Sequence, residues 1–462
     1  KIDQKSWYLQ DNWQITDTFM LYGGIRNDSF ENKNTDGVSF VKQDDIWQPR
    51  LGFSWDVAGN GDSKLFGSLG RYSLPIAANV ALRAASASFY TVNYYTYDGI
   101  DPVSGAPLNT APFRGGSADY VINGENGVAP DPKAVASKGL KPYTQDEAIL
   151  GYQQLLHSDN SFVDGWTLGA KATYRRINQA IDDTCDVRAI YNAAQAQGYD
   201  VAGHWADQWT IPDGLPGCYL YNPGEDLNIT LDVDGDGKAD NIHVDGSALG
   251  PKAKRYYKAL TLSAEKATDK WYASINYTWS KLSGNYEGLV KSTNGQSDTG
   301  TTSDFDFAEI MYGADGYLFN DHRHTLKAYG AYNFTDEWSM GVDLQVQSGA
   351  PISCLGGGTG TFGTEYGYGG VFHYCNGEIA KQGTAGRTPW TWAVNPNVVY
   401  KPQWANGLSL QMSVLNLFNS VKPLQVYETK EDTQYGETYN SYKLGKYYTT
   451  PRYVRFQVQY DF

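Results

Sequence analysis

Apolar and polar residues alternate one by one along many short segments of this chain, and this period of two constrains its fold more than any other feature. In the final segment, the side chains of one face are Val454, Phe456, Val458, Tyr460 and Phe462. The opposite face carries Arg455, Gln457, Gln459 and Asp461. Successive side chains of a β-strand point to opposite faces of its sheet, so the segment predicts a strand with one apolar and one polar side.

The same alternation recurs at Trp166–Tyr174, Trp271–Trp279 and Trp338–Val346, where Trp or Tyr often begins or ends the apolar face. The Lys, Arg, Asp and Gln side chains of the opposite faces could not lie in hydrocarbon without a large cost in free energy. A wall with lipid on one side and water or protein on the other satisfies both faces. The 36 Tyr and 13 Trp residues, together with a mean hydropathy of −0.50, fit the aromatic girdles of such a wall.

No run of about 18 or more apolar residues occurs, so we expect no transmembrane helix. A barrel strand needs only about 10 residues of alternating character. The first residues do not resemble a signal peptide, so the chain is expected to begin after processing or internally. The net charge of −14 argues against general nucleic-acid binding.

Short and long connections alternate between the predicted strands. We predict strands at residues 5–14, 18–29, 46–57, 63–73, 143–156, 165–178, 254–266, 270–283, 323–334, 337–349, 388–401, 407–428 and 449–462. We predict long loops near residues 31–45, 74–142, 180–253, 284–322, 350–387 and 430–448. Short periplasmic turns and long extracellular loops are typical of outer-membrane barrels. Single-chain bacterial barrels have an even number of strands, so this odd count predicts that strands precede Lys1 or, as a less favoured alternative, that another chain completes the wall.

Several stretches spread over the whole chain carry a family resemblance. They are Tyr8–Thr16, Leu21–Arg26, Pro49–Asp56, Lys64–Tyr72, Asp321–His324, Gln347–Pro351, Val414–Asn419 and Pro451–Phe462. Together they resemble the TonB-dependent outer-membrane receptors, especially the Oar-like branch. The resemblance implies an all-β transmembrane antiparallel barrel of about 22 strands filled by a plug. Residues 1–462 would be its C-terminal part, without the plug and the early strands, and Phe462 resembles the signal that the barrel-assembly machinery reads.

The most specific local motif is an acidic stretch that resembles a calcium-binding loop. Its carboxylates occupy the first, third, fifth and ninth positions of that loop, and Gly237 occupies the sixth, where the backbone turns sharply. The predicted ligands, of which the lysine would use its backbone carbonyl, are Asp232, Asp234, Asp236, Lys238 and Asp240. His243 stands where a bidentate Glu is expected. Asp245 is the candidate residue for supplying this missing ligand. We predict a structural calcium ion, with a solvated acidic hairpin as the alternative.

The four cysteines lie in two of the predicted extracellular loops. Cys185 and Cys218 share one loop, and Cys354 and Cys375 share another. Pairing within each loop is the simplest of the three connectivities, and the outside of the cell is oxidising. Each bond would add on the order of 3 kcal/mol of stability by closing its loop in the unfolded chain. Free thiols are the alternative.

His322 and His324 lie two residues apart on a predicted strand and therefore share a face, as two metal ligands would. We favour a strand start at the outer rim of the wall over a metal site. No Ser-His-Asp set or pair of carboxylates with catalytic spacing can be assembled, so the sequence predicts no enzyme.

The family resemblance implies a receptor that binds a scarce solute at its extracellular loops and imports it with energy that TonB supplies through the plug. The loops at 74–142 and 180–253 would form the vestibule. Residues expected to face the lumen, and to hold the plug or line the path, are Lys171, Arg175, Asp343, Gln345 and Gln347. The alternative is a surface protein for adhesion or protein export, in which the large loops bind another protein.

The expected partners follow from this location. They are outer-membrane lipid and lipopolysaccharide, the TonB complex through the absent plug, the barrel-assembly machinery, and an unknown small-molecule, peptide or protein ligand. The sequence does not identify the solute.

Overall fold

The computed structural model of the chain describes residues 1–34, 36–80, 87, 89–113, 120–129, 131–212, 215–293, 295–296, 299–358, 368–432 and 436–462. Its main feature is one large antiparallel sheet, in which 13 strands follow a single path. They are β1 Ile2–Thr16, β2 Phe19–Lys33, β3 Ser39–Trp55, β4 Ser63–Leu74, β11 Tyr143–Leu155, β12 Thr167–Gln179, β17 Arg255–Ala267, β18 Trp271–Gly284, β20 His324–Asn333, β21 Trp338–Gln347, β24 Thr391–Tyr400, β25 Leu408–Leu415 and β30 Tyr453–Tyr460. The predicted all-β fold is confirmed.

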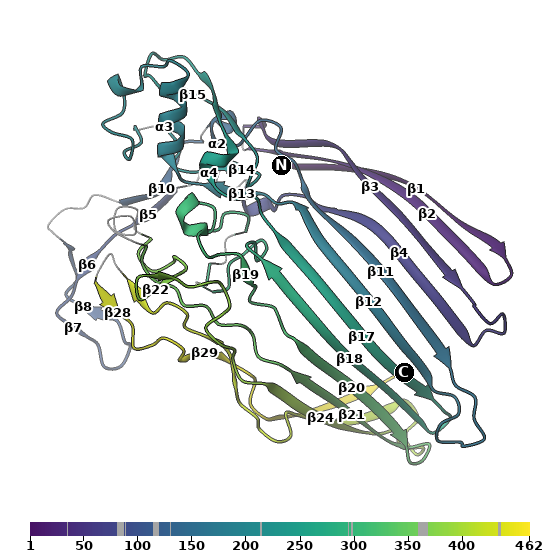
Figure 1. Cartoon of the computed structure of the whole chain (residues 1–462). Helices are drawn as coiled ribbons and strands as arrows, with labels where there is room; N and C mark the ends of the chain where they lie inside the picture. The colour runs from purple at the N-terminus through teal and green to yellow at the C-terminus, as the bar shows by residue number, and fades with distance from the viewer. Residues whose placement is uncertain are drawn as a thin grey trace.

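Each strand inside this path pairs with the long strand that precedes it in the chain and with the one that follows, whereas β1 and β30 at the two edges each pair with one neighbour among the described residues. Figure 1 shows the strands running side by side from a crown of loops at one end to short turns at the other. A further strand, β19 (Gly316–Tyr317), extends the pairing of β18 at the loop end. This arrangement agrees with the predicted alternation of short and long connections, except that the predicted long loop near residues 31–45 is wrong, because β2 extends to Lys33 and β3 begins at Ser39.

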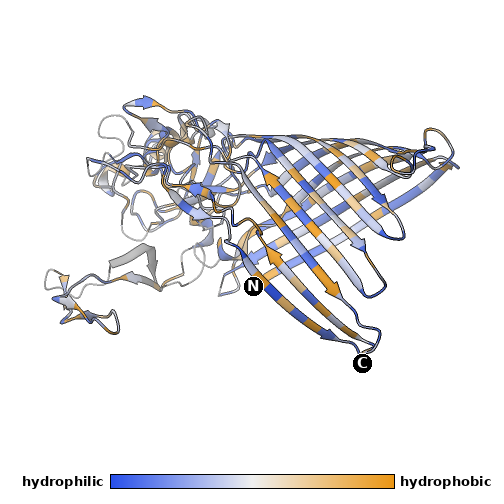
Figure 2. Ribbon diagram, turned by 90° about the horizontal axis from the view of Figure 1, so that it is seen from below, coloured by the Kyte–Doolittle hydropathy of each residue, from blue (hydrophilic) through white to orange (hydrophobic). Residues whose placement is uncertain are grey.

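The two faces of the sheet differ in chemistry, as the period of two predicts. One face exposes large apolar side chains, among them Leu150, Leu260, Trp279 and Phe456, which are 55%, 43%, 40% and 73% exposed. Figure 2 shows the resulting alternation of hydrophobic and hydrophilic residues along the strands. Such a continuous apolar surface is stable against lipid, whereas the polar face can be hydrated or covered by protein. Among the described helices, none is long and apolar enough to cross a membrane.

The predicted strand at 407–428 is wrong beyond its first half. β25 ends at Leu415, because Asn416 and Asn419 adopt left-handed backbone angles, with φ of 50° and 53°. Asn is one of the few residues other than Gly that tolerate this conformation. The chain then begins a separate strand, β26 (Pro423–Val426), which pairs with β29 (Gly445–Tyr448) in the crown.

The long loops fold into a crown with a hydrophobic core of its own. Its short hairpins pair β5 (Phe89–Val92) with β10 (Tyr120–Asn126), β6 (Tyr95–Thr96) with β9 (Ala111–Pro112), β7 (Gly99–Ile100) with β8 (Pro107–Leu108), β13 (Asp182–Thr184) with β14 (Tyr219–Tyr221), β15 (Leu227–Leu231) with β16 (Asp240–Val244), β22 (Tyr374–Cys375) with β23 (Glu378–Ile379), and β27 (Glu431–Asp432) with β28 (Glu437–Thr438). Its helices are α2 (Pro132–Val135), α3 (Val187–Ala196), η2 (Val201–Gly203), α4 (Gly246–Leu249) and η3 (Ala308–Met311). Ile181, Ile190, Leu227 and Leu249 are completely buried there. The crown is therefore a folded body, and it contains most of the buried core.

Candidate functional site

Two loops of the crown are joined by hydrogen bonds between residues far apart in the chain. The Asp182 carboxylate accepts hydrogen bonds from the Thr302 backbone N–H (2.6 Å) and hydroxyl (2.8 Å). Nearby, the Cys185 N–H donates to the Asp306 carbonyl at 3.1 Å. These contacts fix the β13–β14 loop against the loop between β18 and β20, so the crown presents a formed surface.

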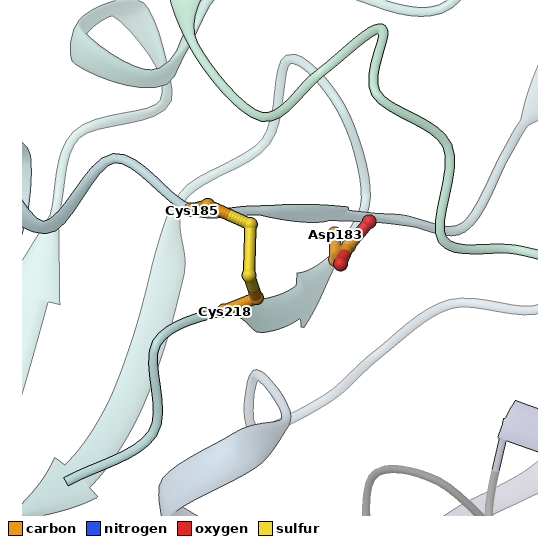
Figure 3. A group of neighbouring side chains, drawn as sticks. All are labelled: Asp183, Cys185 and Cys218. Carbon is orange, nitrogen blue, oxygen red and sulfur yellow. A yellow bond between two sulfur atoms is a disulfide. The ribbon is translucent and has the colours of Figure 1, made fainter. Parts of the chain in front are cut away.

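Both disulfides lie within the loops that the sequence assigned to them. Cys185 bonds to Cys218 across 33 residues, and Cys354 bonds to Cys375 across 21. Figure 3 shows the first bond beside the β13–β14 hairpin, with Asp183 on β13 and Cys185 just after the end of that strand. Ligand atoms of Asp183, Cys185 and Cys218 lie within 4.8 Å of one another, but the two sulfurs bond to each other and leave no thiolate for a metal.

The acidic loop between β15 and β16 brings three of its four predicted carboxylates together. Oxygen atoms of Asp232, Asp234 and Asp236 lie within 4.8 Å of one another. The Asp232 carboxylate also accepts the backbone N–H groups of Gly235 (2.7 Å) and Gly237 (2.9 Å). Gly237 has a φ of +82°, which a residue with a side chain rarely adopts. The oxygen donors fit a hard cation such as Ca²⁺, which takes carboxylate and carbonyl ligands.

The remaining predicted ligands of this loop have other partners. Asp240 accepts the Val233 N–H at 3.3 Å, and burial, followed by its acidic neighbours, raises the pKa of its carboxyl group. The Lys238 ammonium pairs with Asp236 at 2.6 Å, which lowers the pKa of that carboxyl group. Asp245 caps α4 by accepting the Ser247 N–H, so its carboxylate serves the helix instead of the loop.

The residues predicted to face the lumen lie on strands β12 and β21. Arg175 pairs with Glu147 of the neighbouring strand β11. The Asp343 carboxylate accepts amide hydrogens from Gln345 (3.1 Å) and Asn395 (2.8 Å). A recess of about 310 Å³ is lined by Gln345, Gln347, Thr391, Trp392, Ala393, Asn395, Leu415, Asn416, Ser420, Leu424, Thr449, Thr450, Pro451 and Tyr453. Lys171 lies four residues before Arg175 on the same face of β12 and is exposed.

Sequence reasoning missed a group of guanidinium–aromatic contacts on this polar face. The Arg50 guanidinium lies 4.7 Å from the centre of the Tyr72 ring, and that of Arg175 lies 5.6 Å from the Tyr257 ring. Cationic groups over aromatic faces are held by the ring quadrupole. The alternation already placed these residues on the polar face, but the pairing register was needed to bring them into contact.

Buried carboxyl groups in the crown were also missed. Burial raises the pKa of Asp182 to about 7 and that of Asp306 to about 8. The Tyr368 hydroxyl donates to Asp306 at 2.6 Å. Lys291 forms an ion pair with Asp304, and both side chains are buried. The sequence around these residues resembles that of a solvated loop, so no local pattern identifies them.

The Asp321–His324 segment forms a brace at the rim of the wall. Asp321 is fully buried, accepts the Leu282 N–H at 2.6 Å and pairs with both Arg323 and Arg387. His322 bonds to the Ser348 carbonyl, whereas His324 bonds to the Tyr277 hydroxyl. The two imidazoles are therefore engaged by different partners, as the favoured rim interpretation requires.

Comparison with known proteins places the chain beside outer-membrane transporters. Residues 1–417 match the family model described as TonB dependent receptor-like, beta-barrel. The TonB-dependent transporter Oar of Myxococcus xanthus is 25% identical over 426 residues, which cover 89% of this chain and 35% of the relative. The chain thus spans about a third of the length of this curated relative.

Solved structures support the same architecture. The outer membrane transporter YddB from Escherichia coli has a TM-score of 0.52 and 13% identity, with 100% of this chain and 45% of that chain covered. The FrpB iron transporter from Neisseria meningitidis has a TM-score of 0.50 and 14% identity, with coverages of 99% and 46%. At such low identity these likenesses describe the fold alone.

Proposed function

The chain belongs to the TonB-dependent receptor family and lies in the bacterial outer membrane, and we propose that it forms the solute-receiving wall and crown of an active importer. In this proposal, the whole receptor captures a scarce solute at the crown and releases it toward the lumen with TonB-supplied energy. The family match over residues 1–417 carries the proposal. The folded crown supports it, because a surface that is already ordered loses less conformational entropy on binding.

The polar face supplies groups for the inward path. Arg175, Asp343, Gln345 and Gln347 are held by neighbouring strands or line the recess near the crown. In the proposed importer these groups hold the plug or contact the solute after it leaves the crown. Their mixed charge and amide character suits hydrogen bonding to a polar solute.

A solute-depletion experiment tests this proposal. A strain without the protein and its complemented counterpart are grown in the same medium, and the spent media are compared by mass spectrometry. We expect one class of solute to disappear only with the complemented strain, and a protonophore to abolish the difference. Identical depletion in both strains, with surface attachment lost in the deletion strain, would reject import.

We also propose that the acidic loop binds a structural calcium ion through Asp232, Asp234 and Asp236. The cluster of three carboxylates supports this proposal, since their mutual repulsion is relieved by a cation. Calorimetric titration of the purified protein with Ca²⁺ is expected to show one site that the Asp234→Asn/Asp236→Asn variant lacks. Asp159→Asn, in a turn at the opposite end of the sheet, is the matched control and should bind normally. Absence of calcium binding by the unaltered protein would refute the proposal.

One observation favours surface interaction as a second candidate function. The segment with strands β6 to β9 exposes many large apolar side chains, including Tyr95, Tyr97, Ile100 and Val103, which are 56%, 56%, 59% and 95% exposed. Exposed apolar patches often mark protein-binding surfaces. Deleting residues 95–112 would abolish adhesion but leave uptake intact if this function dominates.

A further inference from the structure

Lys291 and Asp304 are in contact inside the crown, and both side chains are nearly inaccessible to solvent. The Lys291 Nζ contacts the Asp304 Oδ1, and the two side chains are 1% and 7% exposed. Within the described part of the chain, Asp304 supplies the one hydrogen-bond acceptor of this ammonium group, which has three N–H donors. Burying charged groups with incomplete hydrogen bonding is costly. A reaction that removes both charges would therefore stabilise the crown.

The backbone of the loop between β18 and β20 holds the two side chains together, although they are 13 residues apart in the chain. The Lys291 N–H donates to the Gln296 carbonyl at 3.1 Å. The Asp304 N–H donates to the Thr302 hydroxyl at 3.4 Å, and Thr302 is in turn bound by Asp182. Groups held in contact react as if they were highly concentrated, because folding has already met the entropic cost of bringing them together.

A third buried group, Asp306, is placed to move protons in such a reaction. The Tyr368 hydroxyl donates to its carboxylate at 2.6 Å, which fixes the orientation of the carboxyl group. Burial raises the pKa of Asp306 to about 8, and the charges of Asp304 and Lys291 also act on this pKa, so Asp306 lies near both. A carboxyl group with a pKa close to the ambient pH is suited both to give and to accept a proton.

We propose that Lys291 and Asp304 form an intramolecular isopeptide bond, which is an amide between their side chains. A proton first moves from the Lys291 ammonium to the Asp304 carboxylate and leaves a neutral amine beside a carboxylic acid. The amine nitrogen then bonds to Cγ of Asp304, the bond between Cγ and the hydroxyl oxygen breaks, and one water molecule leaves. Asp306 gives a proton to the departing hydroxyl and takes one from the nitrogen. The bond is independent of the proposed import, because it forms within one loop of the crown.

The test is peptide mapping of the receptor purified from outer membranes, digested without reduction by trypsin and endoproteinase Asp-N. Trypsin cuts after unmodified Lys, and Asp-N cuts before Asp298, which lies between the two reacting residues. We expect no cut after Lys291, and we expect the peptides with Lys291 and Asp304 to stay joined, with a combined mass lower by one water molecule. The matched control is the exposed pair of Lys42 and Asp44, whose charged atoms lie 2.9 Å apart and which should remain unlinked.

Two variants separate the bond from a folding defect. Lys291→Arg keeps a cation beside Asp304, but its guanidinium stays charged and does not form the amide. Its joined peptides should be absent while both disulfides persist in the same digest. Asp306→Asn keeps both reacting groups, and we expect the bond to form about a hundredfold more slowly when the denatured full chain is refolded into detergent micelles.

The disulfides also show whether the unaltered receptor is folded when it is mapped. Trypsin cleavage after Lys291 in receptor that contains both disulfides would overturn the proposal. Joined peptides in Lys291→Arg would overturn it as well, since the link would then involve another residue. Bond formation at an unchanged rate in Asp306→Asn would overturn the proton-transfer role of Asp306.

Discussion

Lys291 and Asp304 form an ion pair inside the crown, where the two side chains are only 1% and 7% exposed. Removing one partner leaves the other charge buried without compensation. We expect Lys291→Met to lower the free energy of unfolding of the crown by about 3–5 kcal/mol, as measured by denaturant titration with near-ultraviolet circular dichroism. The double variant Lys291→Met/Asp304→Leu should recover much of this loss. Lys42→Met, at an exposed ion pair with Asp44, is the control and should leave unfolding unchanged.

The buried carboxyl groups make crown stability depend on pH. Burial raises the pKa of Asp182 to about 7 and of Asp306 to about 8. Between about pH 4 and those values, the folded chain binds more protons than the unfolded chain, so stability falls as the pH rises. Each group contributes a slope of up to about 1.4 kcal/mol per pH unit. Thermal unfolding between pH 5 and 8 should show this trend, and Asp306→Asn should flatten it.

The buried imidazole of His373 changes the pH dependence of crown stability in the opposite direction. Its effect has to be distinguished from that of the carboxyl groups. It is completely buried, and burial lowers its pKa well below the usual value. Its contribution is therefore lost as the pH falls through the range in which an unfolded histidine protonates, near pH 6.5. The difference between the unaltered protein and Asp306→Asn cancels this contribution. A difference that does not change with pH would contradict the prediction for Asp306.

The Cys185–Cys218 bond closes a segment of 33 residues. We expect Cys185→Ala/Cys218→Ala to lower crown stability by about 3–4 kcal/mol, chiefly because the unfolded loop gains conformational entropy. Limited proteolysis of the crown, followed over time, measures this change. The strands should remain protected, because the bond lies outside the sheet. Cleavage that is equally slow with and without the bond would contradict the prediction.

Asn416 follows the last residue of β25 and has a left-handed backbone. Its side chain makes three hydrogen bonds. Its amide donates to the carbonyls of Ser420 (3.2 Å) and Thr450 (3.0 Å) and accepts the Ser420 N–H at 3.0 Å. Asn416→Ala should cost about 2–3 kcal/mol in unfolding of the sheet, from lost hydrogen bonds and backbone strain. Asn416→Gly keeps the backbone relaxed and should cost about 1 kcal/mol less. Equal losses in the two variants would show that strain plays no part.

The long strands could be predicted from the sequence because lipid on one face and polar surroundings on the other impose a period of two. The end of β25 could not be predicted this way. The residues on both sides of Asn416, from Val414 to Phe418, are apolar, although Asn416 itself turns the backbone. The three adjacent carboxylates of the acidic loop were predictable from local spacing. The hydrogen-bond partners of Asp240 and Asp245 could not be predicted from that spacing.

The crown was the least predictable part because its contacts join distant segments. Arg387 reaches Asp321 across 66 residues, and no local pattern encodes that distance. The burial of Asp182 and Asp306 likewise depends on how separate loops meet. By contrast, pairing of the cysteines within their loops was the simplest choice, and the structure contains those bonds.

The hydrogen bonds between Asp182 and Thr302 have a consequence for the order of assembly. They span 120 residues, and both strands β17 and β18 lie between them in the chain. Closing so large a loop carries an entropic cost that alignment of the intervening hairpin greatly reduces. The crown can therefore close only late, after β17 and β18 are paired, whereas each disulfide spans a short segment and can form earlier. The wall acts as the template on which the crown matures.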